Sequence, residues 1–112
     1  MERTPLIDLV ITYFKRSGYK IERDVIWEGV SGILRRFDIV LRKGNEQILV
    51  WVKDWKRTVG VNMIINVDKA AADVGFPHPI IVSEKFSDHA KAYANRRGVT
   101  LLTRRQMMQR VG

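Results

Sequence analysis

The sequence predicts a mixed α/β fold, in which helices flank both faces of a central mixed sheet of about five strands. The first observation is Gly44-Asn45 between two apolar runs, a pattern typical of a tight hairpin. The second is the alternation of helix-like and strand-like segments after residue 60. The third is the all-apolar run Ile80-Ile81-Val82, which is typical of a parallel strand buried on both faces. The expected order is helix, three strands, helix, strand, helix, strand, helix, within a single domain over residues 1–112.

The first half of the chain begins with a helix and a strand. Thr4 is the expected N-cap of the helix, Pro5 its first residue, and Gly18 its end. A strand is then expected from Tyr19 to Trp27, with an irregularity near Arg23-Asp24, followed by a glycine-rich turn.

The second half carries clear helix signals. A helix is expected from Val61 to Val74 and another over residues 88–97, with Ser87 as its N-cap. A short strand over residues 99–102 follows, and the Thr103-x-x-Gln106 pattern predicts a capping box that opens the last helix.

The register of the central hairpin follows from its two-residue turn. If Lys43 pairs with Glu46, then Asp38 lies opposite Trp51. Lys53, two residues further on, is expected on the same face. The simplest interpretation of Asp38 and Lys53 is an ion pair across a hairpin, and the chemical interpretation is a catalytic pair.

Composition points to a polyanionic partner. The chain has 20 Lys and Arg against 12 Asp and Glu, which gives a formal net charge of +8. A charge of this size favours nucleic acid, while a soluble domain with a basic surface is the plainer alternative. The candidate phosphate contacts are Arg35, Arg36, Lys56 and Arg57.

Other function classes are excluded or disfavoured. The chain has no cysteine, which rules out disulfides, thiolate zinc sites and a cysteine nucleophile. It has no apolar run long enough for a membrane span and no signal-peptide pattern at its start, so a cytoplasmic protein is expected. His78 and His89 lack metal-ligand spacing.

Several segments together resemble a known superfamily. They are Phe-Asp-Ile-Val at 37–40, Trp-Val-Lys at 51–53, KDWKRTVGVNMIINVDKAAADVG at 53–75 and PIIVSEKFSDHAKAYANRRGVTLLTRRQMM at 79–108. This chain resembles the restriction-endonuclease-like superfamily, most closely the Mrr-like nucleases and the archaeal Holliday-junction resolvases. The family motif is an Asp on one strand and then an acid (or Gln), any residue and Lys on the next.

The resemblance implies a restriction-endonuclease-like fold and a metal-dependent endonuclease that acts on DNA. It assigns Asp38 as a Mg²⁺ or Mn²⁺ ligand and Lys53 as the cation at the phosphate. Trp51 stands where the second acid of the motif belongs. The family often has a Glu in its first helix; that position falls on Ile7, so Asp8 is the candidate replacement ligand.

Two functional hypotheses therefore stay open. The first is a divergent Mrr-like or resolvase-like endonuclease that hydrolyses DNA with a divalent metal. The second is a catalytically inactive module that binds nucleic acid or recruits a partner, in which Trp51 either fills the core or stacks on a base. The sequence leaves open whether the protein cleaves at all, whether its partner is DNA or RNA, and whether it forms a homodimer as related resolvases do.

Overall fold

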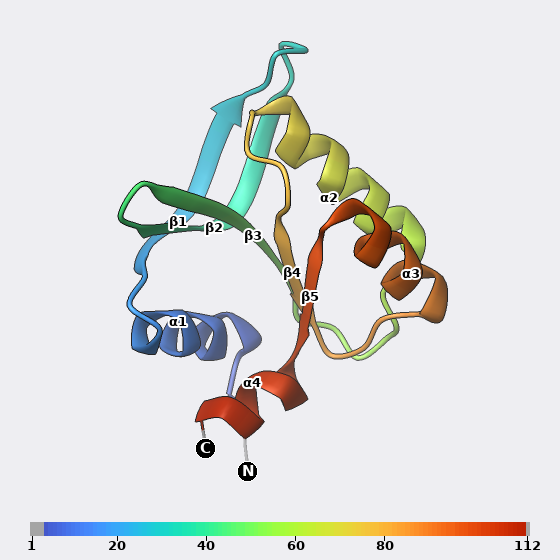
Figure 1. Ribbon diagram of the computed structural model, residues 1–112. Helices are drawn as coiled ribbons and strands as arrows, with labels where there is room; N and C mark the ends of the chain where they lie inside the picture. The colour runs from blue at the N-terminus through green and yellow to red at the C-terminus, as the bar shows by residue number, and fades with distance from the viewer. Residues whose placement is uncertain (1–3, 112) are drawn as a thin grey trace.

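The computed structural model describes residues 4–111, and the expected order of elements is confirmed (Figure 1). The elements are α1 (Leu6–Arg16), β1 (Lys20–Glu28), β2 (Leu34–Lys43), β3 (Glu46–Lys53), α2 (Val61–Asp73), β4 (Ile80–Ser83), α3 (Asp88–Arg97), β5 (Thr100–Thr103) and α4 (Arg104–Val111).

The five strands form one mixed sheet in the order β1-β2-β3-β4-β5. β1, β2 and β3 pair in antiparallel fashion, whereas β3, β4 and β5 are parallel. The carboxyl ends of the three parallel strands therefore lie at one edge of the sheet, from which the chain enters α2, α3 and α4 (Figure 1). This edge is called the carboxyl edge below.

Helices cover both faces of the sheet, as expected from the all-apolar β4, whose four residues are all buried (Figure 1). α1 and α4 pack on one face and α2 and α3 on the other. The first face contributes Leu6, Leu9, Val10, Phe14, Ile39, Leu41, Val50, Val82 and Met107 to the core. Over residues 4–111, none of the helices has the length and apolar character needed to cross a bilayer.

The helix ends match the sequence signals, with one difference. The Ser87 hydroxyl accepts a hydrogen bond from Ala90 N at 3.1 Å. Thr103 and Gln106 form the reciprocal capping box. The N-cap of α1 is Pro5 rather than Thr4, and no side chain of its own segment caps it. Instead, the Leu6 amide donates to Asp54, which lies just beyond the carboxyl end of β3, at 2.8 Å.

The predicted hairpin register holds from Lys43–Glu46 to Ile39–Val50 and then stops. Phe37 and Ile39, which are two residues apart, pack on opposite faces of the sheet. The side-chain alternation of β2 therefore shifts at Asp38. Asp24 of β1 lies opposite Asp38 and has a φ of +51°. It falls between the β1–β2 pairs Arg23–Ile39 and Val25–Phe37. The predicted irregularity at Arg23-Asp24 is confirmed, and from this point β1 and β2 continue without β3.

The distal parts of β1 and β2, with the turn between them, form an arm that projects beyond β3 (Figure 1). Asp73, the last residue of α2, holds the tip of this arm. Its carboxylate accepts hydrogen bonds from Ser31 N at 2.9 Å, Ser31 Oγ at 2.7 Å and Arg35 Nε at 3.0 Å, and its carbonyl accepts from Val30 N. These hydrogen bonds lower the pKa of Asp73 below its ordinary value of 3.8, and the bond from the Ser31 hydroxyl has the largest effect.

We predict that Gly29→Ala destabilises the protein by about 1–3 kcal/mol, because the new methyl group has no room. A Cβ at Gly29 would lie 1.9 Å from Asp73 Oδ2 and would push the carboxylate off Ser31. Urea denaturation measures the loss. Gly60→Ala is the control, since a Cβ at Gly60 meets nothing within 4 Å. An equal effect of the two substitutions would show that the arm does not depend on this contact.

We also predict that the stabilisation from Asp73 depends on pH. Because folding lowers the pKa of Asp73, its contribution is complete above the unfolded value of about 4 and is lost as the pH falls through the folded value. Wild type should therefore exceed Asp73→Asn in stability at neutral pH, and the gap should narrow in acid. Urea denaturation of both proteins from neutral pH down to about pH 3 tests this; a gap that widens in acid would contradict it.

Candidate functional site: the Asp38 fork and the carboxyl edge

Asp38 lies where β2 parts from β3, and its carboxylate bridges the gap. Oδ2 accepts a hydrogen bond from Val52 N at 2.7 Å, in place of the strand pairing that ends at Ile39. Oδ1 accepts from Arg36 Nη1 at 3.1 Å. Arg36 also donates to Asp24 at 2.8 Å, so one guanidinium joins two carboxylates across β1 and β2. Both oxygens of Asp38 are thus engaged within the protein.

The expected placement of Trp51 and Lys53 beside Asp38 is wrong. Trp51 packs edge to face on Phe37, with ring centroids 5.4 Å apart, on the face covered by α2. Asp38 instead hydrogen-bonds the backbone at Val52, whose side chain packs on the α1 face. The physical reason is that the side chains of β2 stop alternating regularly between the two faces at Asp38. Extending the hairpin register from its turn assumes that this alternation continues.

Lys53 is separated from Asp38 as well. Its ammonium lies 5.8 Å from the ring centroid of Trp55, which packs with the α2 and α3 face. No ion pair joins Lys53 to Asp38 among the residues that the structure describes. The simple Asp–Lys ion pair therefore does not form among the described residues, and the catalytic roles of Asp38 and Lys53 stay a prediction.

A pocket of about 200 Å³ opens beside Asp38 on the α1 side. Asp54, which a regular strand would place on the other face from Asp38, lines it together with Asp38. Ile7 also lines the pocket, whereas Asp8 does not and is exposed. The sequence alone does not predict that Asp54 lines this pocket, because its position there depends on α1 starting beside the end of β3. The only sequence signal was its position as the first residue after a strand.

The divalent metal that the family implies does not fit these residues. Hard cations need several oxygen ligands. Trp51 occupies the position of the second acid, and Asp38 is bound to Arg36 and to the Val52 amide. Asp54 accepts from the Leu6 amide, and its other oxygen lies 3.6 Å from Arg104 Nη2. Within residues 4–111, no group of three or more His, Cys, Asp or Glu side chains is arranged to hold a metal ion.

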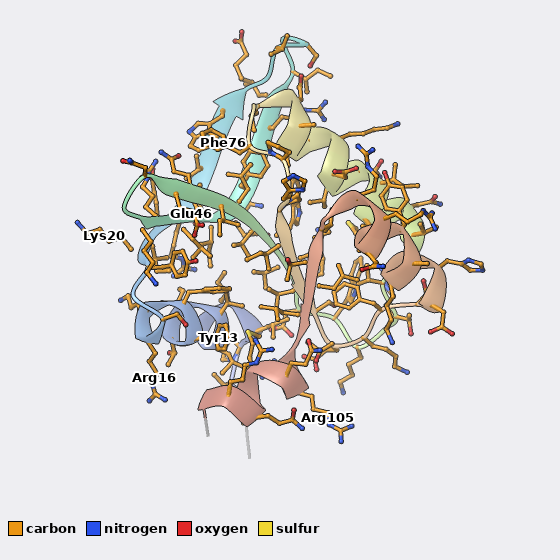
Figure 2. All side chains as sticks on the ribbon, viewed as in Figure 1. Tyr13, Arg16, Lys20, Glu46, Phe76 and Arg105 are labelled. Atoms are coloured by element: carbon orange, nitrogen blue, oxygen red, sulfur yellow. The ribbon has the colours of Figure 1, made fainter. Side chains whose placement is uncertain are left out.

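Cations gather at the carboxyl edge. Lys53 pairs with Ser83 and Ser83 with Thr103, so the three parallel strands end level with one another. The loops that follow are joined, because Val59 N donates to Lys85 O and Ser87 N to Val59 O. Arg105 extends from the start of α4 into solvent (Figure 2). We call this set the carboxyl-edge surface; its members are Lys53, Lys56, Arg57, Lys85 and Arg105.

Trp55 organises the basic loop after β3. The Arg57 guanidinium stacks 4.1 Å from the centroid of the Trp55 ring, with Lys53 on the ring at a longer distance. Such contacts hold cationic side chains in place without neutralising them. Lys56 and Arg57 are both exposed, as expected for phosphate contacts.

The other two candidate phosphate contacts differ. Arg35 is partly buried and forms the ion pair with Asp73 that fixes the arm. Arg36 is exposed, yet it is shared between Asp24 and Asp38. Both arginines are engaged by carboxylates, and they have less free charge to offer than Lys56 and Arg57.

Comparison with known proteins agrees with the fold. A family model described as restriction endonuclease, the Mrr catalytic domain, matches residues 1–111. The chain therefore belongs to this family of restriction-endonuclease-like, Mrr-like nuclease domains. A search of curated proteins found no match.

A crystal structure titled as a protein of unknown function, AF1548, is similar, with a TM-score of 0.82 and 20% sequence identity. The match covers 93% of this chain and 64% of that one, so this chain spans less than two thirds of its relative's length. At this identity the likeness concerns the fold, which is the restriction-endonuclease-like mixed sheet flanked by helices.

We predict that Asp38 stabilises the fold. Asp38→Ala should lower the free energy of unfolding by about 1–3 kcal/mol, because it leaves the Val52 amide and Arg36 without their acceptor. Asp8→Ala, which removes an exposed acid from α1, should cost less than about 1 kcal/mol. Chemical denaturation of the two variants provides the comparison, and an Asp38→Ala protein as stable as wild type would refute the bridging role.

Proposed function

We propose that this chain is a DNA-binding module of the restriction endonuclease family, which contacts the phosphate backbone through its carboxyl-edge surface and does not hydrolyse it. The observation that carries the proposal is the clustering at that edge of cations, all exposed except the half-buried Lys53, in a chain of net charge +8. Ligands of open α/β sheets commonly bind beyond the carboxyl ends of the strands.

Electrostatics at this edge favour an anionic partner. α2, α3 and α4 each begin there, and their first backbone amides carry partial positive charge. Two of the acids near this edge are paired, Glu84 with Arg104 at 2.8 Å and Asp54 with the amino end of α1, whereas Asp88 at the start of α3 is exposed. The lysines and Arg57 outnumber this acid, so the edge keeps a net positive charge to face a phosphate backbone.

The absence of hydrolysis is inferred from the engaged carboxylates. To bind a metal ion, an oxygen of Asp38 would first have to give up its hydrogen bond from Arg36 or from the Val52 amide. In addition, the Lys53 ammonium lies near the Trp55 ring rather than beside Asp38. The family fold supports DNA as the partner class; it does not by itself imply that the reaction is retained.

A second candidate function is a metal-dependent endonuclease with a rebuilt site. The observation that favours it is the pocket lined by both Asp38 and Asp54, with Arg23 and Arg36 beside them. In this alternative an arginine replaces the motif lysine, and Asp54 replaces the missing acid. Both aspartates would have to exchange their present partners for the cation.

One experiment separates the two candidates. Fluorescence anisotropy with linear and branched duplexes should show binding that weakens strongly between about 50 and 200 mM salt. Lys56→Glu/Arg57→Glu should weaken binding at least about tenfold and flatten the salt dependence. Lys69→Glu, at an exposed lysine on α2, is the control and should bind like wild type. No binding at about 50 mM salt would refute the proposal.

Cleavage is assayed with the same DNA in Mg²⁺ and in Mn²⁺. We expect intact DNA. Metal-dependent cleavage that disappears in both Asp38→Asn and Asp54→Asn, with folding verified by circular dichroism, would instead establish the rebuilt endonuclease.

A further inference from the structure

We propose that a second basic surface, at the opposite end of β3, binds the phosphate backbone of duplex DNA independently of the carboxyl-edge surface. The inference rests on the proposed DNA binding and adds a second contact to it. The surface is a hollow of about 400 Å³ beside the β2–β3 turn. It is called the turn-end surface, and its lining residues are Gly18, Lys20, Arg42, Lys43 and Gly44.

Every side chain that lines this hollow is cationic, and the remaining two lining residues are glycines. Gly18 and Gly44 have φ of +91° and +61°, so glycine is favoured there for backbone reasons as well. A Cβ built on Gly44 meets nothing within 4 Å. A phosphate group can therefore approach the backbone at Gly44 closely, whereas the Lys43 side chain lies over Gly18.

The hollow has a fixed frame. Lys43 Nζ donates to Ser17 O at the end of α1 at 3.0 Å and lies 5.2 Å from the centroid of the Tyr19 ring. The Tyr19 hydroxyl donates to Glu46 at 2.8 Å, and this bond raises the pKa of Tyr19. These contacts order the Lys43 side chain before a ligand arrives and reduce the entropy that it loses on binding.

The charge balance at this end favours an anion. Two acids lie close, Glu22 and Glu46; Glu22 is paired with Arg42, and Glu46 accepts from Tyr19. Lys20 projects away from the body of the protein and has no ion-pair partner among the residues that the structure describes (Figure 2).

The two basic surfaces lie at opposite ends of β3. Its eight residues span roughly 25 Å, which exceeds the Debye length of about 8 Å at physiological salt. The two surfaces therefore act as separate electrostatic sites, and removing one leaves the other able to bind.

The test uses a protein without its carboxyl-edge cations. In the Lys56→Glu/Arg57→Glu background we expect residual, salt-dependent binding to duplex DNA in fluorescence anisotropy. Adding Lys20→Glu should weaken that residual binding roughly fivefold to tenfold and lower the salt slope by about one. Lys20→Gln should give a smaller loss in the same direction, and Lys69→Glu should give none. Circular dichroism verifies that each variant is folded.

The outcomes separate this inference from the proposed function. If wild type binds DNA and the carboxyl-edge variant binds none, the turn-end surface is overturned and the proposed function stands. Equal residual binding in Lys20→Glu and Lys69→Glu also overturns it. If wild type itself does not bind, the proposed function fails and this inference fails with it.

Discussion

The fold depends on one carboxylate at the point where β2 leaves β3. Asp38 accepts the Val52 amide on one strand and Arg36 on its own strand, and Arg36 reaches Asp24 on β1. Three strands are thus connected at the point where the regular pairing of β2 with β3 ends. Without an acceptor there, the Val52 amide would lose its bond in a partly buried position, which is costly. Above the fork, the arm is secured by Asp73 at its tip and by the packing of Trp27 and Phe37 on the α2 face of the sheet.

This structural use of Asp38 bears directly on function. In a metal-dependent nuclease the motif carboxylate must be free to bind a cation, whereas here it satisfies a backbone amide and a guanidinium. Trp51, in the place of the second acid, packs on Phe37 and belongs to the core. The same fold that implies a nuclease ancestry therefore supports binding more directly than hydrolysis, because function resides in a site and not in a fold.

The ionic residues divide into two groups. Arginines within the body are matched with acids, as in Arg35–Asp73, Arg97–Asp68 and Arg104–Glu84, and these pairs connect one element to another. Among the described residues, groups of cations without a carboxylate partner lie at both ends of β3, and single ones such as Lys69 lie elsewhere on the surface. Proteins that bind nucleic acid need such clustered cations for affinity, and salt-dependent association follows from them.

The sequence by itself determined the order of elements, the caps at Ser87 and Thr103, the hairpin turn and the basic character of the chain. These depend on local periodicity and on turn chemistry, which act over a few residues. Only the tertiary structure decided that Asp38 faces Val52 and that Asp54 meets the start of α1. A one-residue shift in alternation moves a side chain to the other face of a sheet, and nothing within the hairpin sequence fixes where β1 and β2 bend away together.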